Sequence, residues 1–303
     1  MHVVDRTIVR FLPVVPRSIV QRVSARYIAG PTLDDARQLI AELNAEGKCA
    51  TVDVLGEEVT RPAEAEAVAS AYHAALDAIA ADRLEANVSV KLTALGLELD
   101  LGLCRTLLAE IVADGAARDL FVRIDMEHSA CTDDTLRLYR ELREAGRDNV
   151  GIVLQSRLKR TLADVDRLAD LCPNVRLCKG IYLEPATVAY GSRRHIRESF
   201  LHVLDALLEG GSYVGIATHD EWLLERALTR VAEVPADAYE VQMLLGVREE
   251  RTTELVADGH VLRVYVPYGD RWYEYSLRRL QENPALAGTI AGATMKRVVR
   301  DRG

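Results

Sequence analysis

Short runs of apolar and β-branched residues alternate along most of the chain with longer stretches rich in Ala, Leu, Arg and Glu. The short runs have the length of β-strands, and the longer stretches have the length and composition of α-helices. Strands are predicted at residues 49–54, 88–92, 120–126, 150–154, 175–181, 213–217, 239–243 and 261–266. Helices are predicted after them, near residues 62–82, 101–117, 131–146, 158–171, 193–209, 220–232, 247–258 and 270–282.

This alternation predicts a single α/β domain, a (β/α)8 barrel of the TIM type. Eight strand–helix units in about 250 residues have the size of such a barrel. The strands read as apolar on both faces, as parallel strands between two layers require. A doubly wound sheet is the competing fold, but no G-x-G-x-x-G sequence follows the first strand. No linker interrupts the pattern, so we expect residues 31–303 to form one barrel domain.

The segment before the barrel, residues 1–30, reads as one or two short helices forming an arm on the body of the protein. Arginine and proline break its apolar stretches, so a signal peptide is not expected. Its basic character leaves open a peripheral contact with the inner face of a membrane. A helix over residues 33–46 should follow, because Thr32 can cap it and Asp34 and Asp35 suit its first turn.

Composition narrows the class of protein. The 303 residues carry a formal net charge of −8, so nucleic acid is not expected as a partner. The five cysteines contain no C-x-x-C pair. This pattern argues against a disulfide framework and against a zinc site, and it favours a reducing, cytoplasmic compartment. No apolar run approaches the length of a transmembrane span.

Polar side chains stand at the ends of the predicted strands. In a barrel of this type the active site lies at the carboxyl ends of the strands, so these side chains should face one cavity. They are Asp53, Lys91, Asp125, Glu127, His128, Gln155, Arg176, Lys179, Thr218, His219, Gln242 and Tyr265. Strand ends that face bulk loops would carry more Gly, Asn and Pro. The set therefore favours an enzyme over a scaffold.

Lys91 follows a strand with apolar neighbours, and Asp125 ends the adjacent predicted strand. We expect the two to form an ion pair at the mouth that can bind an anion and anchor a neighbouring base. Asp53 is either a hydrogen-bonding group of the mouth or a member of a structural ion pair. His128 could ligate a metal with Asp125 and Glu127. No second histidine has compatible spacing nearby, so no metal is expected.

Arg176 and Lys179 end one strand together, and Gly180 follows them. One interpretation is a Schiff-base lysine of a barrel aldolase, which needs a desolvated Lys179. The other is an anion or cofactor clamp, in which the two cations neutralise phosphates and Gly180 lets the backbone approach. Two cations close together favour the clamp, although neighbouring cations also lower the pKa of a lysine.

Thr218 and His219 precede a helix N-terminus, where backbone N–H groups favour phosphate. Equally, Thr218 or Asp220 could simply cap the helix that begins at residue 221. Gln242 could hydrogen-bond a heterocycle. Leu244 and Tyr265 offer apolar walls, or are packing residues of the core.

A helix over residues 275–282 would place four polar side chains on one face. Tyr275, Arg278, Arg279 and Glu282 are spaced i, i+3, i+4 and i+7. Two guanidinium groups braced by a carboxylate and flanked by an aromatic ring suit a small carboxylate ligand. Taken alone, the stretch also fits an amphipathic helix whose charged face lies in water.

Eight short stretches together resemble the proline dehydrogenase family, flavin-dependent barrel enzymes of proline catabolism. They occur in family order at residues 90–92 (Val-Lys-Leu), 123–127 (Arg-Ile-Asp-Met-Glu), 154–155 (Leu-Gln), 176–182 (Arg-Leu-Cys-Lys-Gly-Ile-Tyr), 217–219 (Ala-Thr-His), 242–246 (Gln-Met-Leu-Leu-Gly), 263–269 (Arg-Val-Tyr-Val-Pro-Tyr-Gly) and 275–283 (Tyr-Ser-Leu-Arg-Arg-Leu-Gln-Glu-Asn). The chain ends soon afterwards, so it resembles the bacterial form with one activity.

The resemblance implies a distorted barrel with its last helix over the mouth. It also implies bound FAD, oxidation of L-proline to Δ1-pyrroline-5-carboxylate and electron delivery to a membrane quinone. Asp125 and Arg176 are the implied catalytic residues. The implied substrate-binding residues are Lys91, Leu244, Tyr265, Tyr275, Arg278, Arg279 and Glu282. The implied FAD contacts are Met126, Gln155, Arg176, Lys179, Gly180, Ile181, Tyr182, Thr218, His219 and Gln242. The barrel aldolase and a non-enzymatic binding scaffold are the competing hypotheses.

Overall fold

The computed structural model describes residues 25–56 and 59–272 of the chain. Within these residues eight parallel strands form a closed barrel, in which each strand pairs with the next and β8 pairs with β1. The strands are β1 (Cys49–Val54), β2 (Ala86–Val90), β3 (Val122–Ile124), β4 (Val150–Gln155), β5 (Val175–Cys178), β6 (Val214–Ala217), β7 (Tyr239–Leu244) and β8 (Leu262–Tyr268). The prediction of a TIM-type (β/α)8 barrel is confirmed.

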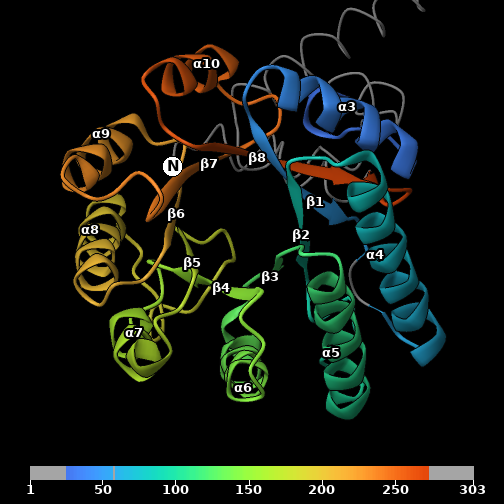
Figure 1. The fold of residues 1–303 in the computed structure, drawn as a ribbon. Coiled ribbons are helices and arrows are strands. Elements are labelled where there is room, and N and C mark those ends of the chain that lie inside the picture. The colour runs from blue at the N-terminus through green and yellow to red at the C-terminus, as the bar shows by residue number, and fades with distance from the viewer. Residues whose placement is uncertain (1–24, 57–58, 273–303) are drawn as a thin grey trace, which may run out of the picture.

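The α-helices form a ring around the strands (Figure 1). They are α3 (Leu33–Ala45), α4 (Pro62–Asp82), α5 (Leu101–Ala117), α6 (Thr132–Glu144), α7 (Thr161–Leu168), α8 (Arg193–Glu209), α9 (Glu221–Val231) and α10 (Glu249–Ala257). Short 3-10 turns are η2 (Ala25–Tyr27), η3 (Ser129–Cys131) and η4 (Ala169–Leu171). Thr32 caps α3 as predicted, because its hydroxyl accepts from the Asp35 amide and the Asp35 carboxylate accepts from Thr32.

The two faces of the barrel wall differ in polarity. Val52, Val88 and Val264 face outward and are buried against the helices. The inner face is largely polar, so the prediction of strands that are apolar on both faces is wrong for that face. Thr51 donates to Asn87 there at 2.6 Å, and further inward groups pair across the barrel as described below. Such groups tolerate burial because they satisfy one another.

Strands β3 and β5 end earlier than predicted, and the difference affects the site. β3 ends at Ile124 and β5 at Cys178, so Asp125 and Lys179 lie just beyond the strands. Gly180 has a φ of +88°, which ends the extended conformation of its segment. Most of the predicted arm (residues 1–30), and residues 273–282 of the last predicted helix, lie outside the described residues.

Candidate active site at the barrel mouth

Asp125 is the centre of a buried polar network at the carboxyl end of the barrel. Its Oδ1 accepts from Arg176 Nη1 at 2.6 Å and from the Ser89 hydroxyl at 2.7 Å. Its Oδ2 accepts from the Tyr265 hydroxyl at 2.9 Å. Strands β2, β5 and β8 thus each contribute one side chain to a single carboxylate, so closure of the barrel assembles this site.

Lys91 enters the same network from the end of β2. Its ammonium lies 2.6 Å from Asp53 Oδ1 and donates to the Tyr265 hydroxyl at 3.1 Å. The predicted partner, Asp125, is farther away, with 3.8 Å between Lys91 Nζ and Asp125 Oδ2. Asp53 is therefore the primary partner of Lys91, which the sequence analysis left undecided. The sequence already indicated this pairing, because the strands that carry Asp53 and precede Lys91, β1 and β2, are neighbours in the predicted strand order.

The two carboxyl groups have opposite pKa shifts. Burial by itself raises the pKa of a carboxyl group. At Asp125 the positive charges of Arg176 and Lys91 outweigh burial, so its pKa lies below the ordinary value. At Asp53 burial outweighs the attraction of Lys91, and repulsion from Asp125 adds to it, so its pKa is raised. The surrounding charges therefore lower the pKa of one carboxyl group of the mouth, while burial raises the pKa of the other.

Arg176 connects this network to a second layer deeper in the barrel. Its Nε donates to Gln242 Oε1, and the Gln242 amide donates to Glu240. Glu240 in turn accepts from Arg263 Nε at 2.9 Å. Glu240 and Arg263 are not among the site residues predicted from the sequence. The chain of contacts orients Arg176, whose guanidinium carbon lies 5.3 Å from the centroid of the Tyr265 ring.

The loop after β5 lies close to the end of β4. Gln155 donates through its amide to the backbone oxygens of Met126 and Glu127, at 3.0 Å and 2.7 Å. A Cβ atom added to Gly180 would lie 2.4 Å from Gln155 Oε1. Only glycine therefore allows this approach. Ile181 and Tyr182 follow on the loop, with Ile181 exposed and Tyr182 half-buried.

A second polar cluster surrounds Asp220 at the start of α9. Its carboxylate pairs with Arg197, with Lys179 at 3.3 Å and with Arg193 at 3.4 Å. These cations outweigh the effect of burial, and the pKa of Asp220 lies well below its ordinary value. Arg193 and Arg197 were missed, although their i, i+4 spacing places them on one face of α8.

Thr218 and His219 hold the turn that enters α9. The Asp220 amide donates to the Thr218 hydroxyl at 3.2 Å, so Thr218 supports the start of the helix. His219 Nε2 accepts from the Leu244 amide at 2.9 Å. A neutral His219 therefore carries its proton on Nδ1. The remaining predicted site residues, Tyr275, Arg278, Arg279 and Glu282, lie outside the described residues.

Comparison with known proteins identifies the family. The family model described as proline dehydrogenase matches residues 36–291. The chain belongs to the proline dehydrogenase family. It is 38% identical over 274 residues to proline dehydrogenase 1 of Bacillus subtilis (strain 168), covering 90% of each chain. It is 36% identical over 279 residues to the proline dehydrogenase of Deinococcus radiodurans, covering 89% of each.

A solved structure of proline utilization A from Bdellovibrio bacteriovorus, inactivated by N-propargylglycine, has the same fold. Its TM-score is 0.81 and its sequence identity 24%, and the match covers 87% of this chain. Our chain spans only 33% of that larger one. The predictions of the family, of the fold class and of an enzyme of the oxidoreductase class are confirmed.

The geometry of the mouth argues against a Schiff-base lysine at Lys179 and against a metal site made by Asp125, Glu127 and His128. Lys179 pairs with Asp220, and 36% of its side chain is exposed. A Schiff-base lysine has to be desolvated, whereas this side chain is partly exposed and its nitrogen is held by a carboxylate. Asp125, Glu127 and His128 do not converge on one point, because Asp125 binds Arg176 while Glu127 accepts from the Thr93 amide at 3.0 Å.

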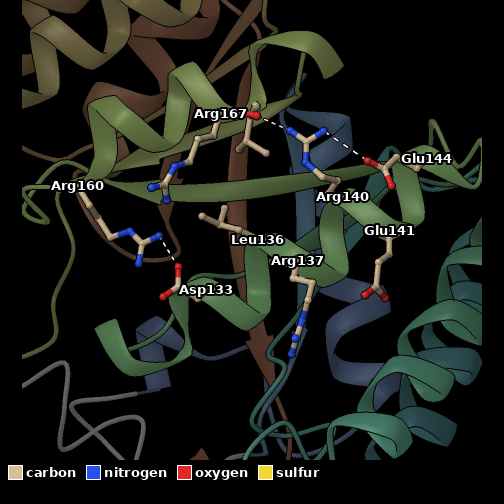
Figure 2. A pocket seen from close by; sticks show the side chains of 9 residues that line it. Asp133, Leu136, Arg137, Arg140, Glu141, Glu144, Arg160 and Arg167 are labelled. Atoms are coloured by element: carbon tan, nitrogen blue, oxygen red, sulfur yellow. Dashed lines mark hydrogen bonds and ion pairs between the residues drawn. The ribbon is translucent and has the colours of Figure 1, made fainter.

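A surface hollow lies between α6 and α7, on the outer wall of the barrel. Figure 2 shows arginines and carboxylates interleaved along it. Arg160 pairs with Asp133 at 2.6 Å, and Arg140 lies 3.5 Å from Glu144. Arginines paired in this way make a solvated, charge-balanced surface. We therefore assign the chemistry to the mouth.

Over residues 25–56 and 59–272, no helix combines the length and the apolar character that crossing a bilayer requires.

Proposed function

We propose that the chain is an FAD-dependent proline dehydrogenase. It oxidises L-proline to Δ1-pyrroline-5-carboxylate and passes the electrons to a membrane quinone. The observation that carries the proposal is the convergence of Lys91, Asp125, Arg176 and Tyr265 on one network. A network of this composition at the mouth of a barrel in this family can hold a small zwitterion beside an electron acceptor.

The residues of the mouth fit a flavin dinucleotide. The cations Lys179, Arg193 and Arg197 beside the start of α9 match the charge of a diphosphate. The other proposed contacts are Met126, Gln155, Arg176, Gly180, Ile181, Tyr182, Thr218, His219 and Gln242. When bound, the flavin supplies an acceptor for the electron pair that leaves proline as a hydride.

The substrate carboxylate is assigned to three cations. Lys91 contributes one charge, and we propose that Arg278 and Arg279 contribute the other two, braced by Glu282. This fixed carboxylate orients the far side of the ring for reaction, which is catalysis by proximity. Tyr265, Tyr275 and Leu244 form the walls around the ring. Walls set for a five-membered ring would exclude bulkier amino acids, and Tyr265 against the ring would disfavour a hydroxylated one.

The charges of the mouth also act on the substrate amine. Hydride loss requires a neutral amine, and a site rich in cations favours release of its proton without a strong base. Asp125 is the implied catalytic carboxylate. The cations that lower its pKa make it a weak proton acceptor, so its role is to hold Arg176 and Lys91 in place. Arg176 provides a fixed positive charge where negative charge develops.

The test is anaerobic addition of L-proline to the purified, flavin-loaded protein. We expect the flavin absorbance to bleach, and the product to react with an amine reagent that detects Δ1-pyrroline-5-carboxylate. Unchanged absorbance in flavin-loaded protein would refute the assignment. Reoxidation by a quinone analogue, measured with and without lipid vesicles, then tests the acceptor and the membrane contact separately. A quinone that fails to reoxidise the protein would remove the quinone from the proposal.

A further inference from the structure

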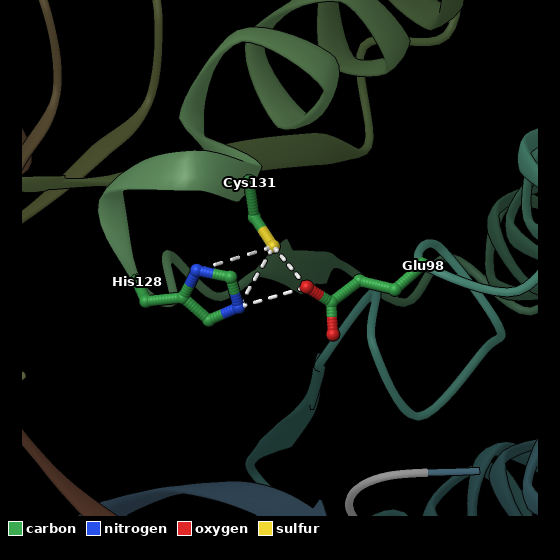
Figure 3. Close-up of side chains that lie close together, drawn as sticks. All are labelled: Glu98, His128 and Cys131. Carbon is green, nitrogen blue, oxygen red and sulfur yellow. Dashed lines mark hydrogen bonds and ion pairs between the residues drawn. The ribbon is translucent and has the colours of Figure 1, made fainter. Parts of the chain in front are cut away.

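Three side chains of different chemistry meet beside the barrel mouth, outside the network described above. His128 Nε2 lies 3.2 Å from Glu98 Oε1 and 3.3 Å from Cys131 Sγ. The distance between Cys131 Sγ and Glu98 Oε1 is 3.9 Å. Figure 3 shows the three groups pointing toward one another. An imidazole nitrogen, a thiol sulfur and a carboxylate oxygen thus form a compact triangle.

The triangle has the dimensions of one face of a tetrahedral zinc site. Zinc binds imidazole nitrogen and carboxylate oxygen at about 2.0–2.2 Å and thiolate sulfur at about 2.3 Å. In a tetrahedron, bonds of that length place the ligand atoms about 3.3–3.6 Å apart. The distances found between these atoms, 3.2, 3.3 and 3.9 Å, bracket that range. An ion can therefore enter with small side-chain movements.

The same geometry does not fit a catalytic relay of cysteine, histidine and carboxylate. In a relay the carboxylate binds one ring nitrogen, and the nucleophile faces the other. Here both Glu98 and Cys131 lie nearest to Nε2 of His128, and Nδ1 is 3.8 Å from the sulfur. Groups that converge on one point in this way are arranged as ligands of one ion.

The backbone holds two of the three groups in place. His128 precedes the 3-10 turn η3, and Cys131 ends it. The Cys131 amide donates to the His128 carbonyl at 3.0 Å. Residues three apart eclipse each other in such a turn, so the local fold brings both side chains to one side. Glu98 comes from the separate loop between β2 and α5, so an ion would connect two loops of the mouth.

Burial and charge suit a cation at this point. Cys131 is buried, His128 is half-buried and Glu98 is exposed, so an ion can enter from the side of Glu98 with a water as its fourth ligand. The carboxylate of Glu98 attracts a divalent cation, and the Cys131 thiol gives up its proton when it binds the ion.

We propose that Glu98, His128 and Cys131 bind a zinc ion that fastens the loop after β2 to the loop after β3. Zinc is preferred because mixed nitrogen, sulfur and oxygen ligands in a tetrahedral arrangement suit it. The His128 ring also packs edge-on against Tyr182, with centroids 6.3 Å apart. The ion would thereby hold His128 against Tyr182, which is one of the proposed flavin contacts on the loop after β5. The sequence predicts no metal here: it pairs His128 with Asp125 and Glu127, and the spacing of the cysteines argues against a zinc site.

The test uses the 303-residue chain with its flavin bound. Its cysteines are kept as thiols, and a chelator first removes any metal. Calorimetric titration with Zn²⁺ should give one site per chain. Co²⁺ should give the strong visible bands of a tetrahedral ion at wavelengths beyond the flavin bands. Cys131→Ser and His128→Gln should each weaken Zn²⁺ binding by at least about 100-fold, because even outer partners of a metal site cost roughly 10–100-fold. The readout is metal binding, so it is independent of proline oxidation.

Controls keep the result decisive if a buried substitution disturbs folding. Glu98→Gln changes an exposed side chain, and we expect it to fold and to bind Zn²⁺ more weakly. Cys172→Ser replaces an exposed cysteine and should leave binding unchanged. Absence of a Zn²⁺ site in the wild-type chain would overturn the proposal. So would full affinity in Cys131→Ser, or the weak bands of octahedral Co²⁺.

Discussion

Two buried carboxyl groups, Asp53 and Asp125, share Lys91, and the surrounding charges give them different pKa shifts. Asp125 accepts hydrogen bonds on both oxygens and has Arg176 against it. Asp53 has one oxygen, Oδ2, without a hydrogen-bond partner among the described residues. The difference explains why burial outweighs the neighbouring charge at one carboxyl group and not at the other. The pKa of each carboxyl group therefore depends on the contacts of its own oxygen atoms as well as on the number of neighbouring charges.

Asp125→Asn should destabilise the fold strongly. The substitution leaves Arg176 buried without its carboxylate, and breaking a buried ion pair costs about 3–5 kcal/mol. Urea unfolding at neutral pH measures the loss. Asp134→Asn is the matched control, because Asp134 pairs with Arg137 on the exposed face of α6. An exposed pair contributes about 0–1 kcal/mol, so equal effects of the two substitutions would contradict the expectation.

Gly180→Ala should destabilise the protein and lower its flavin content. The left-handed conformation costs a non-glycine residue about 1–2 kcal/mol, and the new Cβ would lie 2.4 Å from Gln155 Oε1. Gly211→Ala separates the two effects, because Gly211 has a φ of +72° and no atom within 4 Å of an added Cβ. Thermal unfolding and the flavin-to-protein absorbance ratio give the readouts. Flavin loss in both variants would show that the close approach to Gln155 is unimportant.

At the scale of elements, Asp220 joins parts of the chain that are distant in sequence. It belongs to the turn before α9, Arg193 and Arg197 belong to α8, and Lys179 belongs to the loop after β5. Arg197 also lies over the Trp222 ring, with 4.7 Å from its guanidinium carbon to the ring centroid. The carboxylate thus fixes two helices and a loop relative to one another.

Asp220→Asn should change the pH dependence of stability. The pKa of Asp220 is lowered in the folded protein, so its stabilisation is fully present above the unfolded value of about 3.9. It is lost as the pH falls toward the folded pKa. The variant should therefore be less stable at pH 7, with the difference narrowing below about pH 4. Urea unfolding of the wild type and the variant at pH 7 and below about pH 4 measures this difference in stability.

The control for this pH effect is Asp205→Asn, which removes a partly exposed pair with Arg230 on the outer surface. Its effect should stay within about 1 kcal/mol at neutral pH. The expectation is contradicted if the difference in unfolding free energy between wild type and Asp220→Asn grows as the pH falls.

The predicted helix over residues 275–282 carries a prediction of its own. Arg278→Met should raise KM for proline by an amount equivalent to about 1.5–3 kcal/mol, the contribution of a hydrogen bond to a charged group. Steady-state kinetics with proline provide the measurement. Arg297→Met is the control, because residue 297 lies beyond the matched range of 36–291. Normal kinetics in Arg278→Met would remove this helix from the substrate site.

For the whole molecule, closure of the barrel is the decisive event. β1 pairs with β8 over six residue pairs, from Cys49–Arg263 to Val54–Tyr268. This pairing brings Asp53 from the first strand and Tyr265 from the last strand to Lys91. Because the first and the last strand both contribute residues, the site should form only when the entire barrel has formed.

Val264→Asp should prevent stable folding, because it buries a carboxylate without a partner in the closing strand, where Val264 is 4% exposed. The expected loss exceeds about 4 kcal/mol. Val261→Asp, just before β8, changes a side chain that is 38% exposed, and should alter stability by about 0.5 kcal/mol or less. Circular dichroism with urea unfolding distinguishes them, and cooperative unfolding of Val264→Asp at wild-type stability would be the contrary result.

The sequence by itself determined the order of strands and helices and the class of fold. Periodicity, helix caps and strand lengths are local properties, and the bounds of β1 and α4 agree with residues 49–54 and 62–82 as predicted. It also located many groups of the mouth, since the carboxyl ends of parallel strands meet at one edge. The roles assigned to those groups in binding remain predictions.

Only the tertiary structure decided which side chains meet. Lys91 pairs more closely with Asp53 than with Asp125, and α8 supplies arginines to Asp220. Glu98 reaches His128 across two loops. These contacts depend on strand register, helix rotation and loop path, which the whole barrel sets together. Side chains that are distant in sequence pair only after closure of the barrel has brought them close together. No local sequence pattern specifies which of them will then be in contact.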